Sequence, residues 1–199
     1  SVSFTLLIQW RSATFLSQCS DVVQVSNQFG CTSNRSTVLA LIKICDLLFR
    51  SADNSSNFIR ILFIDFSKAF DVVDHNILLK KFEAYDFPPH IVAWSLSFLQ
   101  DRTQFVRVKN INSNYSNCRL VNAGTPQGTR SGPNGFKLLI NDLSFDIDYA
   151  KYVDDTTVVS VSSDPGDRSL QSAADRLLQW CVDNRMQING KKTKEMLIY

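Results

Sequence analysis

The chain has 199 residues, of which 44% are hydrophobic, and this is enough for one globular domain with its own core. Its 21 Lys and Arg residues nearly balance its 19 Asp and Glu residues, so the net charge of +2 excludes a basic tail protein and an acidic disordered chain. No apolar run reaches the ~20 residues that a membrane span requires. The chain begins at Ser1 without a recognisable signal peptide, and we expect it to be an excerpt of a longer protein.

The first half of the chain predicts helices around one strand. Ser36–Phe49 has apolar residues near helical spacing after a serine that can cap the helix, and residues 51–57 (SADNSSN) have the composition of a loop. Ile59–Phe66 is a short apolar run rich in β-branched and aromatic residues, which is typical of a buried strand. Two further helical patterns follow at Asp74–Tyr85 and Pro89–Leu99.

The second half predicts a pair of strands, a loop and a hairpin. The alternating segment Thr103–Lys109 and the segment Cys118–Val121 suggest an antiparallel pair. Gly124–Gly135 is a loop that enters a helix, with Pro133 suited to the first helical turn. Tyr149–Val161 has two apolar arms around an Asp-Asp pair, which predicts a tight hairpin.

The chain closes with an amphipathic helix at Arg168–Arg185 and a strand at Lys194–Tyr199. Strands and helices therefore alternate without obligatory parallel crossovers. This order predicts an α+β fold, with a small antiparallel sheet and helices on one face.

Cysteine usage favours a reducing compartment. The five cysteines include no C-x-x-C pair, and there are only two histidines, so a zinc site with paired ligands is not expected. Free thiols predict an intracellular protein of the nucleus or cytoplasm rather than a secreted one.

The charges are separated along the sequence. Residues 102–137 contain six basic side chains and no acidic one: Arg102, Arg107, Lys109, Arg119, Arg130 and Lys137. Residues 138–167 contain seven aspartates and a single basic residue, Lys151. A basic stretch suits a polyanion, and clustered aspartates suit hard cations.

Three aspartates have a sequence context that suggests chemistry. Asp65 follows a predicted buried strand, where a carboxylate is costly unless its charge is paired, and Asp154 and Asp155 lie at the predicted hairpin tip. Each alone is more typical of a cap or a solvated turn. If that strand lies beside the hairpin, the carboxylates converge at one edge of the sheet. Carboxylates that share two divalent metals are the arrangement for in-line nucleotidyl transfer.

Four segments resemble, in order and spacing, the motifs of reverse transcriptases from non-LTR (LINE-type) retrotransposons. FIDFSKAFD at Phe63–Asp71 resembles the first catalytic motif, and GTPQGTRSGP at Gly124–Pro133 resembles the Pro-Gln-Gly motif. YVDD at Tyr152–Asp155 resembles the aspartate-pair motif, and NGKKTK at Asn189–Lys194 resembles the lysine-bearing motif that follows it. QFGCTSNRST at Gln28–Thr37 is similar to the upstream fingers segment. The resemblance implies a polymerase palm with a ferredoxin-like sheet and part of the fingers over residues 28–199.

The resemblance also implies roles for individual residues. Asp65, Asp154 and Asp155 would be catalytic carboxylates that bind two Mg²⁺ ions, or Mn²⁺ as a substitute, together with the backbone carbonyl of Phe66. Phe70 would pack against the sugar and exclude a 2′-hydroxyl. The remaining implied roles are nucleotide binding by Gln127 and Gly128, and protonation of the leaving pyrophosphate by Lys192. His75, which the family commonly has at this place, is interpreted as structural.

The implied activity is RNA-directed DNA polymerisation from dNTPs on an RNA template and a DNA primer, with no membrane partner. The basic stretch would then follow the phosphates of the template–primer duplex through Arg102, Arg107, Lys109, Arg119 and Arg130. A solvated face is the alternative for these charges, since six over 36 residues is not dense.

Several departures from the family pattern keep a second reading open. Residues 1–27 lack the family's Arg-Pro-Ile segment and stay unassigned, and Cys31 and Thr32 stand where an aromatic and a basic residue are usual. Asn134 and Gly135 replace leucines, and the chain ends at Tyr199, before the primer grip and the thumb. The alternative is therefore a catalytically inactive retrotransposon remnant that at most binds nucleic acid. A palm-type nucleotidyl cyclase is a third reading, which P-Q-G and FSKAFD disfavour.

Overall fold

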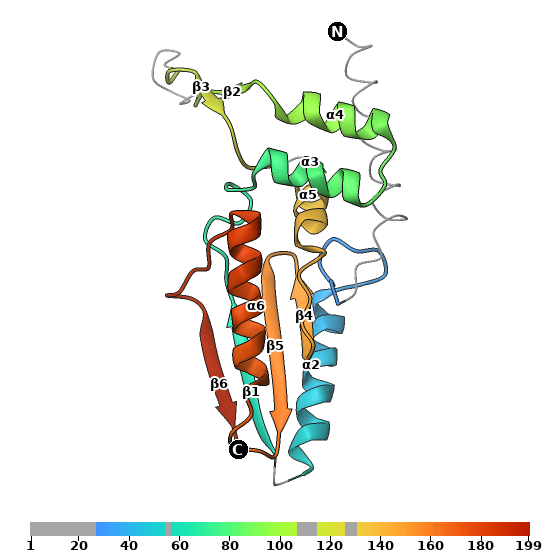
Figure 1. The fold of residues 1–199 in the computed structure, drawn as a ribbon, viewed down its shortest axis with the longest axis vertical. Coiled ribbons are helices and arrows are strands. Elements are labelled where there is room, and N and C mark those ends of the chain that lie inside the picture. The colour runs from blue at the N-terminus through green and yellow to red at the C-terminus, as the bar shows by residue number, and fades with distance from the viewer. Residues whose placement is uncertain (1–26, 55–56, 107–114, 126–130) are drawn as a thin grey trace.

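The computed structural model describes residues 27–54, 57–106, 115–125 and 131–199. Its centre is a four-stranded antiparallel sheet with the strand order β4-β5-β1-β6 (Figure 1). The strands are β1 (Phe58–Ile64), β4 (Asp148–Tyr152), β5 (Asp155–Ser162) and β6 (Lys194–Ile198). Helices lie between β1 and β4 and between β5 and β6 in the chain. This β-α-β-β-α-β order with β1 in the middle is the ferredoxin-like arrangement, so the predicted α+β fold is confirmed.

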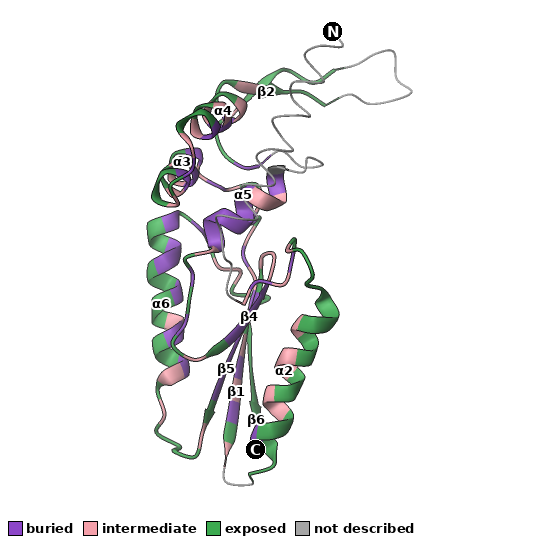
Figure 2. Cartoon of the chain, turned by 90° about the vertical axis from the view of Figure 1, so that its right-hand side faces the viewer, coloured by how far each residue is buried: buried purple, intermediate pink, exposed green. Residues whose placement is uncertain are grey.

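Each face of the sheet is covered by a helix (Figure 2). Val158 lies in the core beneath α6 (Ser169–Asn184), together with Leu177 of that helix. Val159, the next residue of β5, forms a second cluster with Ile59 and Ile61, and α2 (Thr37–Ala52) packs against it. The prediction of helices on one face is therefore correct for α6 and too narrow for the whole chain. The physical reason is that successive residues of β1 and β5 are apolar, which leaves two faces to bury.

Local signals explain where the helices begin. The Ser36 hydroxyl accepts a hydrogen bond from the Leu39 N–H at 3.2 Å and caps α2, as predicted. Helix α3 (His75–Ala84) starts in the same way, with Asp74 accepting hydrogen bonds from two backbone N–H groups. In α4 (Pro89–Leu99) a proline opens the first turn, where its missing N–H costs nothing.

The helices α3, α4 and α5 (Ser131–Ile140) lie beyond one end of the sheet, with the short antiparallel pair β2 (Arg102–Gln104) and β3 (Arg119–Val121) next to α4 (Figure 1). The core continues from the sheet into this part, since Val158 and the buried side chains of α3, α4 and α5 belong to one cluster. The predicted strand Thr103–Lys109 is shorter in the described residues, where β2 ends at Gln104.

Two lysines hold the C-terminal end of α5. Lys151 is fully buried, and its Nζ donates hydrogen bonds to the carbonyl oxygens of Ile140 (2.9 Å) and Leu143 (2.8 Å). Lys81 reaches the same end from α3, donates to the Leu139 carbonyl at 3.1 Å and forms an ion pair with Asp142. The last carbonyls of a helix lack partners within the helix, so these ammonium groups stabilise its end.

Several predicted boundaries are shifted by a few residues, and β1 ends at Ile64 rather than at Phe66. Residues 51–52 belong to the last turn of α2 rather than to a loop. The hairpin turn consists of Val153 and Asp154, because Tyr152 pairs with Asp155 and Asp155 begins β5.

No helix of the described residues combines the length and the hydropathy that a membrane crossing needs. The four cysteines in this part of the chain carry free thiols.

Candidate active site

Asp65 is the first residue beyond β1 and lies at the end of the sheet where the β4–β5 hairpin turns. Its backbone is held on both sides: the N–H donates to the Thr193 hydroxyl at 3.3 Å, and the carbonyl accepts the Asn189 N–H at 2.8 Å. The side chain is half-buried, with 27% of its surface exposed. A rigid backbone therefore presents a carboxylate that solvent and ligands can still reach.

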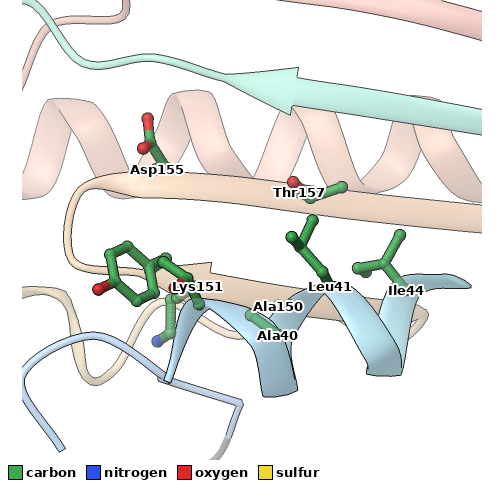
Figure 3. Close-up of a pocket in the computed structure, with 9 residues that line it drawn as sticks. Ala40, Leu41, Ile44, Ala150, Lys151, Asp155 and Thr157 are labelled. Atoms are coloured by element: carbon green, nitrogen blue, oxygen red, sulfur yellow. The ribbon is translucent and has the colours of Figure 1, made fainter. Parts of the chain in front are cut away.

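Strand register brings Asp65 to Asp155. The last pair of the β1–β5 ladder joins Ile64 to Thr156, so the following residue of the chain and the preceding residue of β5 are neighbours at the same end. The carboxylate of Asp155 points toward the β1 side of its strand (Figure 3). Asp154 occupies the second position of the turn, next to it. The three aspartates predicted to converge do lie at one edge of the sheet.

The electrostatics of Asp155 report this convergence. Burial raises the pKa of the Asp155 carboxyl above its ordinary value, the negative charges of Asp154 and Asp65 raise it further, and the Lys192 ammonium acts in the opposite direction. Like charges at short range repel one another, and a bound cation would relieve that repulsion. Within the described residues, however, no three His, Cys, Asp or Glu side chains are close enough together to hold a metal ion.

Lys192 reaches this edge from the turn between α6 and β6. The turn is closed by the Lys192 N–H and the Thr193 N–H, which both donate to the Asn189 carbonyl, at 3.1 and 2.8 Å. Lys192 Nζ lies 3.8 Å from Asp65 Oδ1, and 70% of the side chain is exposed. An exposed pair at this distance contributes little to stability, so the lysine is free to meet a ligand.

The two phenylalanines predicted at the nucleotide site have different surroundings. Phe66 is buried with its ring 5.9 Å from the ring of Trp180, so the ring belongs to the core and is not available to a ligand. Phe70 is half-buried, with its ring 4.7 Å from that of Phe136 in α5. Its backbone carbonyl accepts the Thr125 N–H at 2.8 Å, which joins the first catalytic motif to the segment that leads to α5.

A pocket of about 220 Å³ adjoins the hairpin between α2 and the β4–β5 strands (Figure 3). Apolar side chains of α2, including Leu41 and Ile44, form one wall, and Tyr152, Asp155 and Thr157 contribute to the other. Its lining is mostly apolar, and its two charged residues are Asp155 and the buried Lys151.

The remaining predicted residues lie elsewhere. Arg102 and Arg119 belong to β2 and β3, which lie beside α4 and beyond the end of the sheet (Figure 1). Gln127, Gly128, Arg107, Lys109 and Arg130 lie outside the described residues. His75 is buried, and its Nε2 is 2.8 Å from the Gly124 carbonyl oxygen, with which it forms a hydrogen bond.

One residue at the hairpin has no role in the sequence interpretation. Gln28 is fully buried and hydrogen-bonds through its side chain to the backbone of Val153, 125 positions away. The Q-F-G letters mark the segment, but nothing in them indicates this contact. Only the folded chain brings the two segments together.

Comparisons with known proteins agree with this geometry. The family model described as "Reverse transcriptase (RNA-dependent DNA polymerase)" matches residues 9–197. The chain is 30% identical over 179 residues to the "Probable RNA-directed DNA polymerase from transposon BS" of Drosophila melanogaster, covering 84% of this chain and 19% of that protein. It is 29% identical over 188 residues to the "RNA-directed DNA polymerase from mobile element jockey" of the same organism, covering 87% of this chain and 20% of that protein.

Solved structures share the fold. Apo telomerase from Candida tropicalis, truncated from its C-terminal domain, superposes with a TM-score of 0.66 at 14% identity, over 94% of this chain and 40% of that one. Telomerase from Candida albicans, in complex with a TWJ fragment of telomeric RNA, gives 0.65 at 13% identity, over 91% and 34%. Compared with the two Drosophila relatives, the chain spans about a fifth of their length.

Proposed function

The chain belongs to the reverse transcriptase (RNA-dependent DNA polymerase) family, and we propose that it forms the catalytic palm of an RNA-directed DNA polymerase of a non-LTR retrotransposon. The observation that carries this proposal is the convergence of Asp65 with Asp154 and Asp155 at one end of a ferredoxin-like sheet. Carboxylate oxygens without His or Cys are the type of ligand that Mg²⁺ takes, with water and substrate phosphates completing its shell.

The proposed reaction transfers a nucleotide from a dNTP to a primer on an RNA template. The primer 3′-hydroxyl oxygen forms a bond to the α-phosphorus, the bond from that phosphorus to the β-phosphate oxygen breaks, and pyrophosphate leaves. The hydroxyl gives up its proton as the new bond forms. The Lys192 ammonium, 3.8 Å from Asp65, is close enough to the carboxylate edge to supply a proton to the pyrophosphate.

The oxygen donors at this edge are of the type that Mg²⁺ and Mn²⁺ take, and a bound ion would have to draw the three carboxylates closer together. Asp65, Asp154 and Asp155, together with the Phe66 carbonyl, are the residues that would hold such ions. Burial raises the pKa of the Asp155 carboxyl and the negative charges of Asp154 and Asp65 raise it further; a cation would offset that repulsion, which supports this assignment. When bound, such ions would activate the attacking oxygen and neutralise the triphosphate and the leaving pyrophosphate. The sheet sets the distance between the carboxylates, because Asp65 follows the rigid strand β1 and the aspartate pair lies on the hairpin beside it.

Template and primer would be bound by the basic residues of the β2–β3 region. Arg119 is exposed and lies opposite Gln104 in the short ribbon, and Arg102 lies opposite Val121. Side chains of this kind hold phosphates without reading bases, so duplex affinity would fall as the salt concentration rises.

Primer extension by the chain itself tests the proposal. Extension of a DNA primer on an RNA template should require Mg²⁺ or Mn²⁺ and should disappear in Asp154→Ala, while the circular dichroism spectrum and melting temperature stay close to those of the parent. Asp183→Ala is the matched control, because Asp183 is an exposed aspartate of α6 that bonds only to Gln179 among the contacts described. Equal extension by the parent chain and by Asp65→Asn would contradict the proposal and would favour an inactive remnant.

A further inference from the structure

The turn that carries the aspartate pair has an unfavourable backbone at Val153. This residue has a φ of +59°, in the left-handed region, and it occupies the first position of the two-residue turn between Tyr152 and Asp155. Turns with a positive φ at that position favour glycine, and a β-branched side chain is the least suited to it. Some contact in the fold must therefore keep Val153 in place, because the isolated hairpin would relax.

The side chain of Gln28 provides that contact. Its Oε1 accepts the Val153 N–H at 2.9 Å, and its Nε2 donates to the Val153 carbonyl at 3.2 Å, so one amide group binds both polar groups of the same residue. The Oε1 also accepts the Gly30 N–H at 2.9 Å. Gln28 has no exposed surface, so water cannot replace these bonds when the side chain is changed.

Gly30 closes the other side of Val153. A Cβ atom at Gly30 would collide with Cγ2 and the backbone nitrogen of Val153, so only glycine permits this approach. The valine side chain thus lies directly on the backbone of the 27–30 segment.

The 27–30 segment is itself anchored to β4. The Phe29 N–H donates to the Lys151 carbonyl at 2.8 Å, and the Lys151 N–H donates to the Asn27 carbonyl at 2.7 Å, which forms a parallel bridge centred on Gln28. Arg35 donates to the Gln28 carbonyl at 2.9 Å. These bonds fix the position of the Gln28 backbone, so its side chain can act as a rigid clamp.

We infer that Gln28 is a positioning residue, which with Gly30 clamps Val153 in its left-handed conformation and thereby aims Asp154 and Asp155 at their ligand. The effect on catalysis rests on the proposed polymerase function; the clamp itself does not. Misplacement of a reacting group by ~1 Å can cost about 100-fold in rate. A residue that never touches substrate can therefore control the rate through this turn.

Amide hydrogen exchange tests the clamp without any assay of activity. In Gln28→Met, which keeps the length of the side chain and removes its polar groups, the Val153 amide should exchange at least about 10-fold faster. The amide of Val158, in the middle of β5, should keep its protection. Gln179→Met is the matched control, because Gln179 is an exposed glutamine of α6 that bonds to Asp183, and it should change neither amide.

Unchanged exchange at Val153 in a folded Gln28→Met would overturn the inference. If an equal acceleration at Val153 and Val158 shows that Gln28→Met has lost the whole fold, Gln28→Asn replaces it, and unchanged exchange at Val153 in that variant would overturn the inference. The shorter amide cannot reach both polar groups of Val153, and the same local acceleration is expected.

Manganese titration and kinetics test whether Gln28 controls the orientation of the Asp154 and Asp155 carboxylates. Mn²⁺ should broaden the amide resonances of Asp65 and Asp155 in the parent chain, and about 10-fold more Mn²⁺ should be needed in Gln28→Met. Primer extension should show a kcat lowered by about 100-fold with the KM for the primer–template unchanged. An equal Mn²⁺ response in both chains would reject the aiming role.

The two proposals fail in different ways. If the parent chain binds Mn²⁺ but extends no primer, the polymerase function is contradicted while the clamp is still decided by exchange and titration. If extension is normal in Gln28→Met, the positioning role is wrong and the polymerase function stands.

Discussion

Lys151 Nζ donates a hydrogen bond of 2.9 Å to the carbonyl oxygen of Ile140, the last residue of α5, from a position with no exposed surface in the central sheet. Burial lowers the pKa of the Lys151 ammonium to about 8; the negative charge of Asp142 raises it, and the positive charge of Lys81 lowers it. The same side chain thus stabilises a helix end and carries a buried charge. Its backbone also bonds to the 27–30 segment, so it links α5 to the hairpin clamp.

Lys151→Met should lower the free energy of unfolding by about 1–3 kcal/mol at pH 7, because the carbonyl oxygens of Ile140 and Leu143 lose their donor. The difference from the parent should grow as the pH rises above about 8. A lysine whose pKa is lower in the folded state than in the unfolded state disfavours folding while charged, and this cost disappears between the two pKa values. Urea denaturation at several pH values measures both effects. A difference that shrinks above pH 8 would show that the ammonium is not disfavoured by burial.

Asp74 predicts a pH dependence of the same sign in the acid range, where the stability that it contributes also grows as the pH rises. Burial alone would raise the pKa of its carboxyl, but hydrogen bonds from the N–H groups of Ile77 and Asn76, together with Arg185, outweigh burial and lower the pKa below its ordinary value. A carboxyl of this kind stabilises the fold above its unfolded-state pKa, and the contribution is lost as the pH falls through the folded-state pKa. Asp74→Ala should therefore cost about 1 kcal/mol at pH 7 and much less in strong acid.

Thermal unfolding of Asp74→Ala and the parent at neutral and acid pH measures that change. A loss of about 1 kcal/mol corresponds to a drop of roughly 2–4 °C in Tm for a chain of this size. Asp74→Asn is the control, because asparagine caps helices as well as aspartate does and loses only the charge interaction with Arg185. An Asp74→Ala penalty of the same size at both pH values would contradict the cap assignment.

Variants of Lys192 and of its neighbour Lys191 distinguish a role in proton transfer from a general effect of positive charge. Both are exposed, and in the described part of the chain the ion pair with Asp65 involves Lys192. Lys192→Leu should lower kcat for primer extension by about 100-fold or more, as expected for loss of a general acid, and Lys191→Leu should change it little. The pH dependence of kcat distinguishes proton transfer from a purely electrostatic effect. If Lys192 donates a proton, its replacement removes the fall of kcat at basic pH; if it contributes only charge, that fall remains. Equal losses in the two variants would favour a purely electrostatic role.

Phe70 is expected to select the sugar. Phe70→Val should raise the efficiency of ribonucleotide incorporation relative to deoxynucleotides by at least about 10-fold, because a smaller side chain leaves room for the 2′-hydroxyl. Phe136→Leu is the matched control: it removes the ring 4.7 Å from Phe70 but not the proposed gate. Ratios of kcat/KM for dNTP and rNTP measure the change. The same shift in both variants would mean that packing, and not the gate, controls selectivity.

Much of this protein is determined by local sequence. The period of apolar residues predicts α2, α3, α4 and α6 to within a few residues. Ser36 and Asp74 cap the first two of these helices, and a proline opens α4. The strand at Ile59–Phe66 and the hairpin around the aspartate pair follow from short apolar runs next to turn residues. The family motifs then point to Asp65, Asp154, Asp155 and Lys192, and the structure brings these four to one edge.

The tertiary structure alone decides the rest. The second covered face of the sheet depends on where α2 packs, and the end of α5 depends on Lys81 and Lys151, which come from different elements. Most of all, the Val153 backbone depends on Gln28, 125 residues away in the chain. Turn preferences favour glycine at the position of Val153, because they reflect only local steric clashes. They do not include a distant side chain such as Gln28, whose amide group binds both the N–H and the carbonyl of Val153. Sequence determines which elements form and which carboxylates meet; only long-range packing determines how the turn between them is held.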